Sequence, residues 1–369
     1  ASWRRRWTER DCRPGALRET GEGYLVWTEQ ELKQHLKEGV PKRVYFLWGD
    51  EPYLSARYAE RIRAISVGGE LSEFNCEALD GQECTAEQIE AAAETLPLMA
   101  ERKCVTVRDF DAAGNAGETA RILELLANPP ETCVLIFWQC GVAADVKKNA
   151  KWKAFAAAAD KCGAAVELPR RTAAEAARLL CAGAKKRGCT LRSAEAELLV
   201  SRCGSDLHRL LGELDKLCAI ADGGDITETL IRGATGESLE ARVFDLSKQL
   251  LAGNMTQAQE IVHTLQETRE KPTAVLAVLS GAYVDWYRVK VAQLGGMPAE
   301  AVGRVFSYRG REFVLRNAAR DVQRLPIEVL RDSLRLLGRA DRTMKSSPVD
   351  KWLVLERTVV QLGRRLRSA

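Results

Sequence analysis

The sequence has 369 residues, a net charge of +4, 46% hydrophobic residues and 29% charged residues. Such a chain is too long for one ordinary core and too apolar to be disordered, so we expect two or three folded domains. No apolar run approaches the roughly 18 residues of a membrane helix, and no apolar segment follows the basic N-terminus as in a signal peptide. The small net charge does not indicate a nucleic-acid partner, which only a local basic cluster could do.

Eleven cysteines and three histidines are scattered along the chain, and no two cysteines have the spacing CxxC. A zinc site needs four convergent ligands with short local spacings, so none is predicted. Most cysteines fall within apolar runs and are interpreted as small buried hydrophobic residues. This usage favours a reducing, cytoplasmic setting. We expect neither a metal nor another cofactor.

In chain order, residues 1–22 are interpreted as a basic arm or a translation-start extension outside the fold. From about residue 41 to 169, strand-like runs alternate with helical segments, which is typical of a parallel sheet wrapped by helices. The expected strands are Val44–Trp48, Phe74–Leu79, Cys104–Val107, Cys133–Trp138 and Ala165–Leu168. The expected helices are about 52–66, 85–94, 117–127 and 147–160. We therefore predict an α/β domain over residues 23–169.

After Pro169 the strand patterns stop and the rest of the chain reads as helix. A small helical domain is predicted over residues 170–236, with a capping box formed by Thr172 and Glu175 at its start. A second helical domain is predicted over residues 237–369. In its segment 326–344 the apolar residues fall close to helical spacing and leave arginines on the other face.

One turn, residues 95–103, carries three large apolar residues (Leu96, Leu98 and Met99) around Pro97. Proline cannot continue the helix predicted before it, so the chain should turn there. The apolar side chains could complete the local core. Alternatively, they could be an exposed anchor that docks into a pocket of another protein, because apolar patches left in water usually mark interfaces.

The loop after the first predicted strand is the usual phosphate-binding position of a parallel α/β domain. Here the segment 47–54 holds one glycine, no lysine and two adjacent acids, Asp50 and Glu51, so ATP binding is disfavoured. The strand 133–138 ends without the acidic residues that hold magnesium in active NTPases. We find no catalytic motif elsewhere. The tripeptide 201–203 has the letters of an arginine finger but falls in the second domain, and we interpret it as coincidence.

Several segments in the same order resemble the family of delta subunits of bacterial DNA polymerase III, over more than 300 residues. They are Tyr45–Leu54, Thr95–Val105, Gly204–Leu207 with Glu213–Leu217, Val243–Leu246 and Asp341–Lys345. The resemblance implies a RecA-like AAA+ domain, a helical lid and a helical collar, with no ATP bound by this subunit. It also implies a subunit of the polymerase holoenzyme without a catalytic site of its own.

The same resemblance implies that the first domain binds the ring-shaped beta sliding clamp and favours its opened form. The anchoring pair would be Leu98 and Met99, with Leu96 and Pro97 in the same segment. We expect Leu98 and Met99 to point outward and Leu96 inward. The family most often has phenylalanine where this chain has Met99, and methionine can fill the same kind of pocket. The collar would assemble with the gamma/tau ATPase subunits and delta-prime.

A local basic cluster over residues 304–324 contains six arginines against two acids, with Phe306 and Tyr308 interleaved among the arginines. Arginine can pair with phosphates while an aromatic ring stacks on an unpaired base. If the collar contacts primer-template DNA, the candidates are Tyr308, Arg309 and Arg311. An ordinary solvated helix face with core aromatics explains the cluster equally well.

Two other functions remain open from the sequence. The chain could be an ATP-hydrolysing AAA+ protein with an aberrant phosphate loop, which equilibrium ATP binding would distinguish. It could also be a helical scaffold unrelated to replication.

Overall fold

The structure, a computed structural model, describes residues 18–19, 24–67, 72–306, 308 and 312–367. The chain divides into two compact units, Ala1–Arg170 and Arg171–Ala369, and each is described by itself. Within the described ranges, no helix is long and apolar enough to cross a bilayer.

The first unit is built on one seven-stranded sheet, ordered β1-β2-β7-β3-β6-β5-β4. All neighbouring strands pair in parallel except β1 with β2. The strands are β1 (Arg18–Glu19), β2 (Leu25–Trp27), β3 (Val44–Trp48), β4 (Cys76–Asp80), β5 (Lys103–Arg108), β6 (Cys133–Trp138) and β7 (Gly163–Glu167). The five predicted strands are confirmed as β3 to β7, and β6 lies centrally, as its apolar residues on both faces require.

Two strands and one helix were not predicted. β2 is followed by α1 (Glu29–Glu38), which begins with a capping box between Thr28 and Glu31. Arg18–Glu19 pairs with β2, so this part of the predicted N-terminal arm belongs to the sheet. The other residues of the arm lie outside the described ranges.

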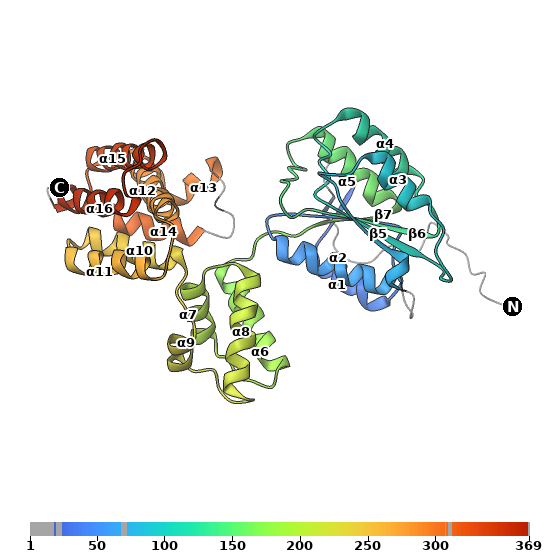
Figure 1. The fold of residues 1–369 in the computed structure, drawn as a ribbon, viewed down its shortest axis with the longest axis horizontal. Helices are drawn as coiled ribbons and strands as arrows, with labels where there is room; N and C mark the ends of the chain where they lie inside the picture. Colours follow the sequence, from blue (N-terminus) through green and yellow to red (C-terminus); the bar gives the residue numbers. More distant parts are fainter. Residues whose placement is uncertain (1–17, 20–23, 68–71, 307, 309–311, 368–369) are drawn as a thin grey trace. The chain divides into compact units, whose positions relative to one another are not determined.

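Helices cover both faces of the sheet (Figure 1). One face carries α1 and α2 (Pro52–Ser66), and the other carries α3 (Ala86–Glu94), α4 (Ala116–Ala127) and α5 (Ala150–Cys162). A short 3₁₀ helix, η1 (Glu73–Asn75), stands where the sequence predicted the start of the second strand. Aromatic rings fill the core beneath α5, where Phe155 packs edge-on against Phe46 and Phe137. The α/β class is therefore confirmed.

In the described part of the second unit, all the regular elements are helices, apart from one isolated bridge between Thr190 and Asp225. Its first four helices are α6 (Ala173–Lys186), α7 (Ser193–Cys203), α8 (Leu207–Ala221) and α9 (Glu228–Ala234). The predicted capping box of Thr172 with Glu175 starts α6.

The other helices are α10 (Leu239–Leu251), α11 (Met255–Glu267), α12 (Pro272–Leu294), η2 (Ala299–Ala301), α13 (Val302–Val305), α14 (Glu312–Asp321), α15 (Ile327–Ser346) and α16 (Lys351–Arg367). They share one apolar core, in which Tyr283 and Trp286 of α12 are buried. The boundary at residues 236/237 between two helical domains stays a prediction, because all these helices lie in one compact unit.

Candidate functional site

The apolar turn lies between α3 and β5, at residues 95–102. Because β5 is parallel to its neighbours β4 and β6, this turn lies at the end of the sheet where strands begin. The phosphate-binding position lies at the opposite end, where strands finish. The two candidate sites of the first unit therefore occupy opposite ends of one sheet.

Three large apolar side chains of this turn are exposed to solvent: Leu96 is 78% exposed, Leu98 53% and Met99 89%. The inference that Leu98 and Met99 point outward is confirmed. The expectation that Leu96 points inward is wrong. Pro97 is half-buried between them. We call residues 96–99 the apolar loop.

A single asparagine side chain holds the backbone of the apolar loop. Asn75 is 2% exposed, and its Nδ2 donates to the carbonyl oxygen of Leu98 at 2.9 Å. The amide N–H of Leu98 donates back to Oδ1 of Asn75 at 2.6 Å. Both backbone groups of Leu98 are thus satisfied, and its side chain can face water without leaving an unpaired polar group behind.

Both ends of this turn are fixed as well. Thr95 ends α3, and its N–H and hydroxyl both donate to the carbonyl oxygen of Ala91. Lys103 begins β5 and is 5% exposed. Its ammonium group donates to the carbonyl oxygen of Ala92 and lies 3.5 Å from Oε2 of Glu77. The chain is therefore held before, within and after the apolar loop.

Met99 adopts a left-handed backbone conformation, with φ of 50°. This costs about 1 kcal/mol or more in a residue with a Cβ atom, and such strain persists only where the surroundings impose it. Beside Met99 lies a shallow hollow of about 420 Å³, lined also by Pro41, Ile65 and Val67. An exposed apolar side chain held in a strained conformation is typical of a binding surface.

The sequence analysis missed two residues near the apolar loop. One is Asn75, which holds the loop, and the other is Phe74 of η1, which precedes Asn75 in the chain and is 73% exposed. Both residues were interpreted as the start of a strand. The only signal in the sequence was the aromatic Phe74 followed by the short polar Asn75. This pair occurs in strands and in turns, so it could not have identified η1.

At the opposite end of the sheet, Gly49 follows β3 where a phosphate loop would begin. A Cβ atom on Gly49 would lie 2.1 Å from the carbonyl oxygen of Leu168, so the glycine allows the backbone after β7 to pass closely. Glu51, which precedes α2, is 5% exposed, and Pro52 in the first turn of α2 has no N–H to offer a phosphate. The start of α2 therefore carries an acidic side chain and lacks one of the backbone N–H donors that another residue would provide. Both features are unfavourable for binding an anion.

A second group of backbone donors at this end is already occupied. The N–H groups of Cys140, Gly141 and Val142, which follow β6, all donate to Oδ1 of Asp109 at 2.7, 2.8 and 3.1 Å. Successive amides of this kind form anion-binding concavities, and here the protein's own carboxylate fills one. Among the described residues, no group of acidic, histidine or cysteine side chains could hold a metal ion.

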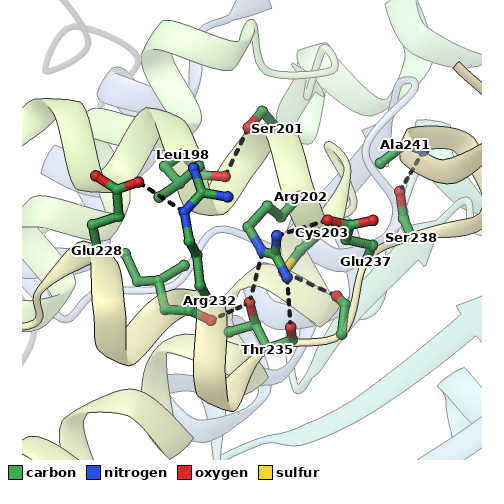
Figure 2. A network of polar contacts seen from close by, with 12 residues as sticks. Leu198, Ser201, Arg202, Cys203, Glu228, Arg232, Thr235, Glu237, Ser238 and Ala241 are labelled. Atoms are coloured by element: carbon green, nitrogen blue, oxygen red, sulfur yellow. Dashed lines mark hydrogen bonds and ion pairs between the residues drawn. The ribbon is translucent and has the colours of Figure 1, made fainter. Parts of the chain in front are cut away.

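The arginine of the tripeptide 201–203 is held within its own chain, as Figure 2 shows. Its Nη1 donates to Oε1 of Glu237 at 2.7 Å, and its Nη2 donates to the carbonyl oxygen of Thr235 at 3.1 Å. The carbonyl oxygen of Arg202 accepts the N–H of Ser238, whose hydroxyl caps α10. Arg202 therefore joins α7 to the segment that leads into α10, which favours coincidence over an arginine finger.

Of the three DNA candidates, only Tyr308 lies within the described residues. It is 6% exposed, its hydroxyl donates to Asp285 of α12, and Nη1 of Arg288 donates to that hydroxyl at 3.0 Å. A ring buried in this way cannot stack on a base, so the prediction for Tyr308 is wrong and the core-aromatic alternative holds for it. Arg309 and Arg311 lie outside the described residues.

Comparison with known families gives two matches that follow one another along the chain. Residues 45–160 match the family model "DNA polymerase III, delta subunit". Residues 240–362 match "DNA polymerase III delta subunit, C-terminal domain". Together the two models cover more than half of the chain, including the apolar loop.

Similar proteins agree with these matches. The DNA polymerase III subunit delta of Bacillus subtilis is 26% identical over 343 residues, which cover 91% of this chain and 97% of that protein. The solved structure of a Bacillus subtilis DNA clamp loader delta protein has a TM-score of 0.64 and 25% identity, and the match covers 91% of this chain and 99% of that one. From the fold, the two consecutive family models and these full-length similarities, the chain belongs to the DNA polymerase III delta subunit family.

Proposed function

We propose that this protein is the clamp-loader subunit that binds a sliding clamp and favours its opened form during DNA replication. The apolar loop, with Leu98 and Met99 as its anchors, would dock into a pocket of the clamp. The observation that carries the proposal is the exposure of these side chains on a backbone that Asn75 holds in place.

The energetics of such an anchor are sufficient. Burying two large apolar side chains stabilises a complex by about 3–6 kcal/mol in total. A few well-placed anchors usually supply most of the binding free energy of an interface. Because the loop is held before binding, little conformational entropy is lost when it docks, which favours affinity.

Opening of the clamp needs no chemistry in this subunit. A ligand shifts a two-state equilibrium only by its different affinity for the two states, so the protein must bind the open clamp more tightly than the closed one. We propose that it works without bound ATP and without a catalytic site of its own, as a subunit of the DNA-directed DNA polymerase in the cytoplasm. The closed phosphate position around Gly49 and Glu51 supports this part of the proposal.

The partners follow from the family. The solved relative is described as a clamp loader protein, and we propose that α10 to α16 form a collar that assembles with the gamma/tau ATPase subunits and delta-prime. Within that complex the chain would act at primer-template DNA. No contact among the described residues of the first unit favours the alternative of an ATP-hydrolysing AAA+ protein.

The test is binding of purified sliding clamp to immobilised wild-type protein and to the double variant Leu98→Ala/Met99→Ala. We expect the wild type to bind and the variant to lose about 100-fold or more in affinity, since the anchors are worth about 3 kcal/mol at least. A matched control replaces two other exposed apolar residues, Ile220→Ala/Leu353→Ala, which are 54% and 59% exposed in the second unit.

The control variant should bind the clamp as the wild type does. Failure of the wild type to bind would overturn the proposed function. Equal losses in the two double variants would instead show that general surface hydrophobicity, and not the apolar loop, mediates the interaction.

A further inference from the structure

A groove on the second unit is lined mostly by arginines. Its volume is about 670 Å³, and its lining residues come from α15 and α16: Asp332, Arg335, Gly338, Arg339, Arg342 and Arg365. We call it the arginine groove. Four of its six residues are cationic and one is anionic, so it carries a local charge of +3.

The pairing of these arginines leaves most of their charge available. Arg335 lies 3.0 Å from Asp332, but both side chains are more than half exposed, and such surface pairs are weak. Arg365 is half-buried, and its Nη1 approaches the carbonyl oxygen of Asp332 at 3.5 Å, which places it over α15. Arg339 and Arg342 are exposed and form no ion pair within the part of the chain that the structure describes.

The positions along α15 form a row. Arg335, Arg339 and Arg342 are four and three residues apart, which places them on one face at steps of about 6 and 4.5 Å along the axis. Basic residues near a helix C-terminus are often explained by the helix dipole, but that effect is confined to the last turn. Arg335 and Arg339 lie well before the last turn of α15, so the dipole does not account for them.

Gly338 of α15 also lines the groove. It is exposed in the interior of α15, and a Cβ atom there would meet nothing within 4 Å. Packing therefore does not require a glycine, although glycine disfavours a helix by about 1 kcal/mol relative to alanine. Its effect is to leave open space at this position in the lining of the groove.

We infer that the arginine groove binds the phosphate backbone of a nucleic acid, at a site separate from the residues 304–324 that the sequence indicated. Arginine pairs with phosphate through two parallel N–H donors, and a row of such groups matches a polymer that carries its charges in series.

No lining residue is apolar or aromatic. Protein interfaces usually need apolar anchors, whereas nucleic-acid interfaces are polar and strongly positive, so the groove fits a nucleic acid better than an acidic protein. Without an aromatic ring, binding should be independent of sequence.

The experiment measures the fluorescence anisotropy of labelled single-stranded and duplex oligonucleotides with the full-length protein over a range of salt concentrations. The test variant is Arg339→Ala/Arg342→Ala. The control is Arg178→Ala/Arg357→Ala, which removes two exposed arginines of the second unit, from α6 and α16, outside the groove and outside the row on α15. We expect the test variant to bind about tenfold more weakly at low salt, and its salt slope to fall by about 1.4 for a single strand and about 1.8 for a duplex. The control should change both much less.

A third variant separates binding from folding. Gly338→Leu leaves the charge unchanged and fills the groove, so oligonucleotide binding should weaken severalfold while the melting temperature stays the same or rises. Equal losses in the test and control variants, or none in the test variant, would overturn the inference. Tighter binding of a polyglutamate peptide than of the oligonucleotides would overturn the nucleic-acid assignment. Clamp binding by all three variants should be that of the wild type, so this inference and the proposed function fail independently.

Discussion

The two ends of the parallel sheet differ in how their polar groups are used. Where the strands finish, the backbone donors after β6 are filled by the carboxylate of Asp109, and Gly49 lies against the backbone of Leu168. Where β5 begins, Asn75 and Lys103 bind the backbone around a turn whose apolar side chains remain in water.

The difference shows how one α/β domain can lack a phosphate-binding site at one end of its sheet and expose an apolar binding surface at the other. At both ends the protein's own side chains satisfy the backbone. Where the strands finish, the carboxylate of Asp109 occupies the free backbone donors after β6, and the start of α2 after β3 has a proline in its first turn. At the strand starts the satisfied backbone leaves Leu96, Leu98 and Met99 exposed. Contacts with ligands are therefore expected only at the second end, and four predictions test this contrast.

The largest effect is expected for Gly49→Ala. The added Cβ would lie 2.1 Å from the carbonyl oxygen of Leu168, at a backbone φ of 140°. Overpacking and backbone strain together should lower the free energy of unfolding by about 3 kcal/mol, measured by calorimetry. Gly212→Ala in α8 is the control, since its Cβ would meet open space, and it should be neutral or stabilising. A Gly49→Ala variant as stable as the wild type would mean that close packing does not explain this glycine.

A smaller effect is expected for Asn75→Asp. The substitution keeps the shape and the acceptor for the Leu98 N–H, but a carboxylate oxygen would then face the Leu98 carbonyl oxygen. Loosening of the apolar loop should weaken clamp binding by about 1–2 kcal/mol, measured as a dissociation constant. Asn115→Ala is the control at the other end of the sheet, where Asn115 caps α4. It should cost about 1 kcal/mol of stability and leave clamp binding unchanged. Weaker clamp binding by Asn115→Ala and unchanged clamp binding by Asn75→Asp would show that the clamp contacts the other end of the sheet.

Met99→Phe should strengthen clamp binding by about 0.5–1 kcal/mol. Phenylalanine has fewer rotatable bonds than methionine and offers a larger rigid surface, while the left-handed backbone strain at this position is the same for both. Titration calorimetry with the clamp would measure the gain, with Met99→Leu as a comparison of similar volume. Weaker binding of the phenylalanine variant would show that the pocket requires a flexible side chain.

The smallest expected effect is that of magnesium-ATP, which should not change the melting temperature of the protein. A ligand that binds the folded state raises its stability, and the acid and the proline at the start of α2 disfavour a triphosphate. Equilibrium dialysis with labelled ATP is the direct measurement. Saturable binding would revive the alternative of an ATP-hydrolysing protein.

Much of the fold could be predicted from the sequence, because apolar runs and capping boxes are local signals. All five strands from β3 to β7 follow such runs, and α2 was predicted at its exact bounds. β2 was missed because three residues are too few for a pattern. α1 could have been found, since Thr28 and Glu31 have the capping-box spacing.

The apolar loop was only partly predictable. Pro97 indicated a turn and its apolar neighbours indicated an anchor, but no periodicity applies to a turn in which Met99 is left-handed. The predicted inward orientation of Leu96 was therefore wrong. The role of Asn75 depends on a contact between residues 23 positions apart, which no local pattern reveals. The same holds for the arginine groove. The helical spacing of the sequence predicted arginines on one face of α15, but it did not indicate that Arg365 of α16 lies beside them.

The hydrogen bonds from Asn75 reach only the main chain of Leu98. They do not depend on which side chains positions 98 and 99 carry. The turn should therefore keep its backbone conformation when the side chains at these two positions are replaced. Evolution or protein engineering can then alter the specificity of docking without refolding the domain. Libraries randomised at these two positions should stay folded while their affinities for clamps diverge.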